Sequence, residues 1–193
     1  MQRSKLLSLA AVLTVATALG AVAPQMAEAQ RRSVDIGTPH SGQRPFQLDI
    51  HGGFTWWGNG VATGARFGIP LLQNGFVSSI NNAVYLNFGI DFYWVERDYD
   101  PGRRYWHYGA GFGLPVALHW EFYFTENWSA FAELGVNVFF HPSVFHNGRG
   151  WDVHPGAWVL FQVGGRFHIN EWFALTLRVG NPYVSFGITF LLG

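Results

Sequence analysis

The sequence contains no cysteine, and Asp, Glu, Lys and Arg make up only 12% of its 193 residues. The missing cysteine excludes a disulfide framework and thiolate chemistry. Ordinary soluble domains are about 25% charged, so this composition is untypical of a soluble enzyme. The only lysine is Lys5, and the formal net charge is zero. Without a basic excess, we expect no nucleic-acid partner.

Long apolar runs are missing except at the start of the chain. Arg3 and Lys5 precede the apolar run Leu6–Ala23, and Ala27-Glu28-Ala29 is a small-x-small cleavage site. This pattern predicts a secretory signal peptide over residues 1–29, with Gln30 as the mature N-terminus. An uncleaved anchoring helix is the alternative, and the cleavage motif disfavours it. No other run reaches the roughly 20 apolar residues of a transmembrane helix.

Aromatic residues reach 18% and alternate with small or polar ones. Between Trp106 and Phe124, every even position is apolar or aromatic, and every odd position except Ala117 and Pro115 is polar, aromatic or Gly. A period of two indicates a strand, because successive side chains leave opposite faces. A soluble strand averages about 5–6 residues, whereas a tilted membrane strand needs about 9–11. The stretch therefore predicts a strand with lipid on one face and a barrel lumen on the other.

The same alternation recurs after a polar segment, residues 30–45, which we predict to be a flexible periplasmic lead-in. The chain predicts an all-β fold, an eight-stranded antiparallel up-and-down transmembrane β-barrel over residues 46–193. The predicted strands are 46–57, 61–72, 83–95, 106–124, 128–140, 157–168, 173–179 and 183–192. Tight turns TEN (125–127) and INE (169–171) lie at one end, and polar loops 96–104 and 141–156 at the other. Short periplasmic turns opposite longer outer loops are typical of such barrels.

Charged residues of the predicted strands all fall on the polar face. Because an unpaired charge in a bilayer is costly, we expect them inside the barrel, where both signs can pair. They predict an ion-pair network that plugs the lumen, and a selective pore lined by the same charges is the alternative. The residues are Asp49, Arg66, Asp91, Glu121, Glu133, Arg166 and Arg178.

Tryptophans gather near the predicted strand ends, as in the aromatic girdles of membrane barrels. The outer rim would hold Trp56, Trp94 and Trp106, and the inner rim Trp120, Trp128 and Trp172.

Histidines raise the question of a metal site. Three of them share the 141–156 connection with Asp152, but their spacing matches no ligand motif. We therefore predict no metal and no cofactor. We also predict no catalytic residues, because Ser129 and Ser143 lie in no nucleophile motif. The loop histidines are His141, His146 and His154, and those predicted to face the lumen are His51, His107, His119 and His168.

From Phe46 to Gly193 the chain resembles the small eight-stranded outer-membrane barrels of the OmpA/OmpX type. The resemblance rests on the signal peptide, the alternating strands, the phrases FYFTENW and HINEWFAL, and the closing strand. It implies contacts with outer-membrane lipid and lipopolysaccharide, and insertion by the outer-membrane assembly machinery. The assembly signal of that family matches Ser185, Gly187, Phe190 and Leu192. The family usually ends on an aromatic residue, whereas Gly193 ends this chain. We expect no peptidoglycan-binding domain.

Fold alone does not select one role. The first hypothesis is a monomeric outer-membrane barrel with a plugged lumen and a structural or surface-interaction role through its extracellular loops, whose partner the sequence does not identify. A narrow channel for small solutes and a membrane-embedded lipid-A-modifying enzyme are the alternatives. A soluble lipocalin-like barrel would require every strand to turn its apolar face inward and its charged residues outward.

Overall fold

The computed structural model of the chain describes residues 34–56, 60–100, 105–142 and 153–193. Within these ranges, eight antiparallel strands form a closed barrel in sequence order, which confirms the predicted fold class. The strands are β1 Phe46–Thr55, β2 Val61–Leu72, β3 Asn82–Asp100, β4 Tyr105–Tyr123, β5 Trp128–Pro142, β6 Val153–His168, β7 Phe173–Asn181 and β8 Tyr183–Leu192. The predicted signal peptide lies outside the described residues.

The described part of the chain contains no helix that is long and apolar enough to cross a membrane.

The first and last strands close the barrel. β1 pairs with β8 along its whole length, from Phe46 opposite Leu192 to Thr55 opposite Tyr183. Every strand therefore has two hydrogen-bonded neighbours, which satisfies the backbone groups that an open edge would expose.

Two hairpins are longer than predicted. The segments predicted as loops 96–104 and 141–156 are partly strand, since Asp100 pairs with Tyr105 and His141 with His154. The loop prediction was wrong there because a strand that extends beyond the apolar band does not need one apolar face. A strand with charged residues on both faces has the same sequence pattern as an exposed loop. Residues 101–104 and 143–152 lie outside the described part.

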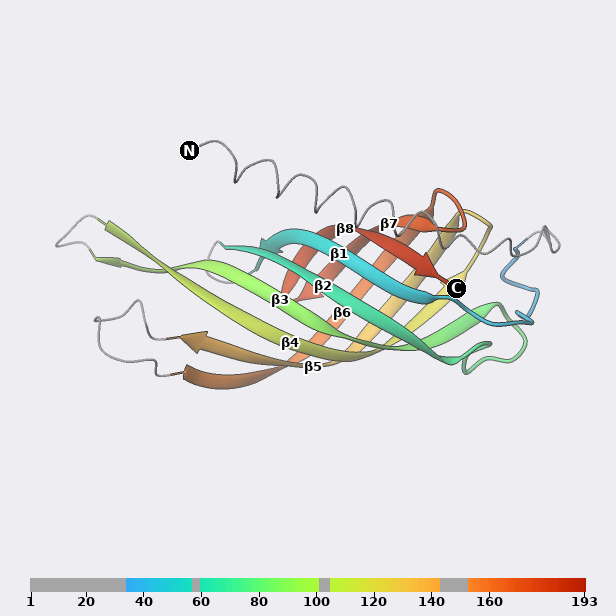
Figure 1. Cartoon of the computed structure of the whole chain (residues 1–193), viewed down its shortest axis with the longest axis horizontal. Helices are drawn as coiled ribbons and strands as arrows, with labels where there is room; N and C mark the ends of the chain where they lie inside the picture. The colour runs from blue at the N-terminus through green and yellow to red at the C-terminus, as the bar shows by residue number, and fades with distance from the viewer. Residues whose placement is uncertain (1–33, 57–59, 101–104, 143–152) are drawn as a thin grey trace, which may run out of the picture. The chain divides into compact units, whose positions relative to one another are not determined.

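The two ends of the barrel differ, and we call them the long-hairpin end and the short-turn end. At the long-hairpin end, β3 continues beyond its last pair with β2, Val61 opposite Trp94. β6 likewise extends beyond its last pair with β7, Phe161 opposite Asn181. The β3–β4 and β5–β6 hairpins therefore project past the wall made by β7, β8, β1 and β2 (Figure 1).

The lead-in, described from residue 34, contacts the short-turn end. The backbone of Asn81 donates to Ile36 O at 2.8 Å. Arg44 hydrogen-bonds Gln73 O at 3.1 Å and the Asn81 side chain, and its guanidinium lies 4.0 Å from the centre of the Tyr123 ring. These contacts involve polar and aromatic groups without periodicity, so the pattern of the sequence did not reveal them.

Candidate functional site: the ion-pair network of the lumen

The barrel wall separates apolar from charged side chains. On β4, Leu114, Val116 and Leu118 are exposed on the outside, whereas His119 and Glu121 are fully buried inside. The same alternation holds on the other strands. All seven charged residues predicted to face the lumen are buried there, and the described side chains of the strands include no other Asp, Glu, Lys or Arg.

Glu133 lies at the centre of the interior. Its Oε2 accepts from Arg66 Nη1 at 2.6 Å, and its Oε1 lies 3.3 Å from Arg178 Nε. The same Oε1 is 2.8 Å from His119 Nδ1 and accepts from Asn87 Nδ2 at 3.1 Å. Side chains from four other strands thus converge on one carboxylate of β5, which ties opposite walls of the barrel together.

Asp91 is the acidic centre nearer the long-hairpin end. Its Oδ2 lies 3.4 Å from Arg66 Nη2 and accepts from Tyr183 Oη at 2.9 Å and Tyr93 Oη at 3.0 Å. His51 links this group to the next acid, because its Nε2 lies 2.8 Å from Tyr183 Oη and its Nδ1 lies 2.9 Å from Asp49 Oδ1.

Glu121 is the acidic centre nearer the short-turn end. Arg166 Nη1 donates to its Oε2 at 2.7 Å, and His119 Nε2 lies 3.3 Å from the same oxygen. Gln47 Nε2 donates to Oε2 at 3.0 Å, and Ser129 Oγ donates to Oε1 at 2.6 Å. Glu121 is therefore contacted by polar side chains from four strands.

The pairing explains why so much charge is tolerated inside. Removing a carboxylate or guanidinium from water costs several kcal/mol unless partners compensate. Each of the four acids has at least one arginine partner. Asp49 pairs with Arg178 at 2.7 Å, and Glu121 pairs with Arg166. Asp91 and Glu133 both pair with Arg66. The arrangement pairs opposite charges across the lumen.

Phe131 fills the space beside the network. Its ring lies 5.5 Å from the Arg166 guanidinium carbon and 5.4 Å from that of Arg178, within the range of cation–π attraction. The ring fits because Gly164 opposes it: an added Cβ at that position would collide with the Phe131 ring and with the backbone oxygen of Leu177.

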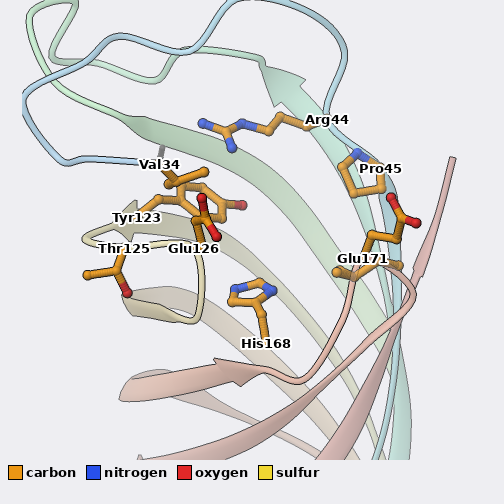
Figure 2. Close-up of a pocket in the computed structure, with 9 residues that line it drawn as sticks. Val34, Arg44, Pro45, Tyr123, Thr125, Glu126, His168 and Glu171 are labelled. Carbon is orange, nitrogen blue, oxygen red and sulfur yellow. The ribbon is translucent and has the colours of Figure 1, made fainter. Parts of the chain in front are cut away.

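A pocket of about 280 Å³ opens at the short-turn end. Figure 2 shows Glu126 and Glu171, from the two tight turns, together with His168 of β6 and Arg44 of the lead-in. The His168 side chain is 12% exposed, whereas that of Glu121 is 0% exposed. His168 is thus where the polar interior meets the pocket. The lining residues are Val34, Arg44, Pro45, Tyr123, Thr125, Glu126, His168, Glu171 and Leu191.

Outward-facing tryptophans occupy both ends of the barrel. Trp56 and Trp94 are 64% and 45% exposed at the long-hairpin end, and Trp128 and Trp172 are 55% and 44% exposed at the short-turn end. Trp120 instead packs against Phe76, with ring centres 5.3 Å apart, and its indole N–H donates to Asn82 Oδ1 at 2.9 Å. The Trp106 side chain lies outside the described part.

The residues of the predicted assembly signal alternate on β8. Ser185 and Gly187 face the interior, whereas Phe190 and Leu192 are exposed on the outside. Across the described residues, no group of three His, Cys, Asp or Glu side chains is arranged to hold a metal. His146 and Asp152 lie outside that part.

Sequence reasoning missed several neutral members of the network. Tyr93, Tyr183 and Asn87 all face inward by the same alternation, and this inward facing was the available signal. Ser129 Oγ also lies 3.0 Å from His168 Nε2, beside Glu121. In this group the serine hydrogen-bonds the acid directly at 2.6 Å, whereas His168 Nε2 lies 3.9 Å from Glu121 Oε1. The order therefore differs from a Ser-His-acid triad, and the hydroxyl is buried.

Comparisons with known proteins show the fold. No protein-family model matches the chain, and no curated protein matches it in sequence. The N-terminal β-barrel domain of OprF from Pseudomonas aeruginosa is similar, with a TM-score of 0.50 and 11% identity over 78% of this chain and 98% of that chain. A second similar structure is Ail, the attachment invasion locus protein of Yersinia pestis, solved with the heparin analogue sucrose octasulfate. Its TM-score is 0.44, with 13% identity over 77% of this chain and 96% of that chain. The chain has the fold of the small eight-stranded outer-membrane barrels.

Proposed function

We propose that the chain is an outer-membrane barrel with a lumen plugged by the ion-pair network, and that it presents its long hairpins to the outside. The observation that carries the proposal is the separation of charge: seven ionisable side chains are buried within the wall, and large apolar side chains cover its outer face. A soluble barrel would gain nothing from such a surface, whereas lipid requires it.

The dimensions support the same placement. The shortest strand, β7, has nine residues, and β1 and β8 have ten each, about the length that crosses a bilayer at a tilt. Outward tryptophans at both ends match the two interfaces of a membrane. On this proposal the chain is a monomer that contacts lipid and lipopolysaccharide and is inserted by the outer-membrane assembly machinery.

The long hairpins support a structural or surface-interaction role. β3 and β4 have 19 residues each, and β5 and β6 have 15 and 16, so half of the barrel extends well beyond the other half. A rigid barrel that anchors projecting hairpins is suited to contacts outside the cell.

The test combines fractionation with an electrophoretic shift. We expect the protein in the outer-membrane fraction, with faster migration before boiling than after, as a detergent-resistant barrel gives. Protein recovered in the soluble fraction, or migration unchanged by boiling, would contradict the proposal. Planar-bilayer recording at neutral pH then distinguishes the plug, which predicts a closed baseline, from a solute channel, which predicts steady openings.

A further inference from the structure

A hydrogen-bonded chain of proton-carrying side chains runs from the pocket at the short-turn end to the centre of the ion-pair network. It contains five residues, which we call the relay: His168, Ser129, Glu121, His119 and Glu133. Successive contacts measure 3.0 Å, 2.6 Å, 3.3 Å and 2.8 Å.

The atoms of the relay are ordered for inward proton transfer. His168 Nε2–H donates to Ser129 Oγ, whose own proton points to Glu121 Oε1. The other carboxylate oxygen of Glu121 faces His119 Nε2, and His119 Nδ1–H points to Glu133 Oε1. Each transfer breaks one N–H or O–H bond and forms the next. Between the second and third transfers, the protonated Glu121 carboxyl turns about its Cγ–Cδ bond, so that the proton taken up at Oε1 is presented to His119 Nε2. The net result is that one proton from pocket water reaches Glu133, with no other reactant.

The relay has only one open end among the described side chains. Glu133 connects onward to Arg66 and Arg178, which lead to Asp91 and Asp49, and guanidinium groups do not give up protons in proteins. Its remaining partner, the amide of Asn87, is no proton carrier either. A second route out of Glu121, toward Thr176 and Asp49, passes through Arg166 and is blocked in the same way.

The groups around the relay determine what an arriving proton does. A proton on Glu121 removes the negative partner of Arg166, and one on Glu133 removes the partner of both Arg66 and Arg178. Either change leaves a buried guanidinium without its counter-charge, which weakens the plug. The other polar, titratable or aromatic groups in contact are Gln47, Asn87, Tyr85, Phe131 and Tyr123, with Arg44 beside Tyr123.

We propose that the relay makes the plug respond to the pH of one compartment, the one that the short turns face. The only partly exposed member, His168, opens into the pocket lined by Glu126 and Glu171, whose carboxylates attract cations, protons included. Acid on that side reaches Glu121 and Glu133 and loosens the plug, whereas acid at the long-hairpin end meets the arginine barrier. The inference rests on the plugged lumen proposed above.

The experiment is planar-bilayer recording with one chamber acidified at a time. The orientation of the protein is fixed by Ser79→Cys in the exposed β2–β3 connection at the short-turn end, labelled with a membrane-impermeant thiol reagent, because the chain has no cysteine of its own. Lowering the pH in steps from about 7 to about 2, a range that covers the titration of carboxylates paired with arginine, at the short-turn side should raise open probability about tenfold. The same change at the other side should leave it unaltered.

Variants test the relay itself. Ser129→Ala and His168→Phe interrupt it near its entrance and should abolish the response to acid on the short-turn side. Ser129→Thr keeps the hydroxyl and should retain the response. Ser185→Ala is the matched control, since Ser185 is buried in the same lumen and its Oγ has no hydrogen-bond partner among the described residues. All variants are refolded in vitro, so the predicted role of Ser185 in cellular assembly does not enter the comparison. An electrophoretic shift on boiling confirms folding of each variant.

The outcomes separate the two proposals. Steady openings of the wild type at pH 7 on both sides would overturn the plug. A closed wild type that opens equally from either side, or that stays closed down to about pH 2 on the short-turn side, would overturn the relay alone. A wild-type response in folded Ser129→Ala would do the same.

Discussion

Arg66 Nη1 and Glu133 Oε2 lie 2.6 Å apart although 67 positions separate the two residues in the chain. Arg66 is on β2 and Glu133 on β5, so the contact crosses the lumen and joins walls that share no backbone hydrogen bond. The stability that the interior gives to the barrel therefore depends on pairs between residues far apart in the chain, and these pairs form only when the barrel closes.

Replacing the central carboxylate should destabilise the barrel. Glu133→Gln leaves Arg66 and Arg178 facing a neutral amide, and breaking a buried pair typically costs about 3–5 kcal/mol. We expect a lower free energy of unfolding in urea titrations followed by tryptophan fluorescence in lipid vesicles, and more frequent bilayer openings at neutral pH. Ser185→Ala serves as the control; if Glu133→Gln matched it in both measurements, the central role of Glu133 would be refuted.

The outer face should reject charge. Phe88 is 38% exposed on the outside and pairs with Phe67 and Val116 on its neighbouring strands. Phe88→Arg should lower the free energy of unfolding, measured in vesicles, by about 2–4 kcal/mol if the site lies near the bilayer midplane. Phe88→Leu keeps the site apolar and should cost far less. Equal stability of the arginine and leucine variants would rule out a lipid-facing wall.

Close packing around Gly113 gives a test by rescue. An added Cβ would lie 2.5 Å from Asn137 Oδ1 and 3.0 Å from the Tyr93 ring, so the side chain of Asn137 must move. Gly113→Ala should cost about 1–3 kcal/mol, the usual penalty of overpacking. Combining it with Asn137→Ala should give less destabilisation than the sum of the two single changes. Strict additivity in the unfolding titrations would show that the two positions do not share that space.

Arg44 should hold the lead-in against the short-turn end. Arg44→Lys keeps the charge but loses the planar group that bonds Gln73 and Asn81 while lying over Tyr123. We expect faster hydrogen exchange at the amide of Asn81, which donates to Ile36 O, with unchanged exchange in the middle of the strands. If the Asn81 amide exchanged as slowly as in the wild type, the contact would not restrain the segment.

The period of two made the fold and the facing of the charged residues predictable. On β4 the outward Leu118 and the inward Glu121 both follow from parity alone, because one face meets only apolar groups. Partners within the lumen were not predictable in the same way. Whether Glu133 meets Arg66 or Arg166 depends on strand stagger and side-chain reach, which alternation does not encode.

The loop prediction at residues 96–100 was wrong, and the contacts of Arg44 were not foreseen, for the same physical reason. Both lie where the two faces of the chain are polar, so no apolar pattern marks their structure. The relay contact between Ser129 and His168 also depends on the stagger between β5 and β6, since the two residues are 39 positions apart.

Pairing of the first strand with the last places residues 46 and 192 side by side at the same end. A short linker can therefore join them, and new chain ends can be opened in any other connection while the interior is preserved. Such circularly permuted proteins would end on a strand other than β8. They would therefore separate the structural role of β8 in the barrel wall from its role as the C-terminal strand during membrane insertion.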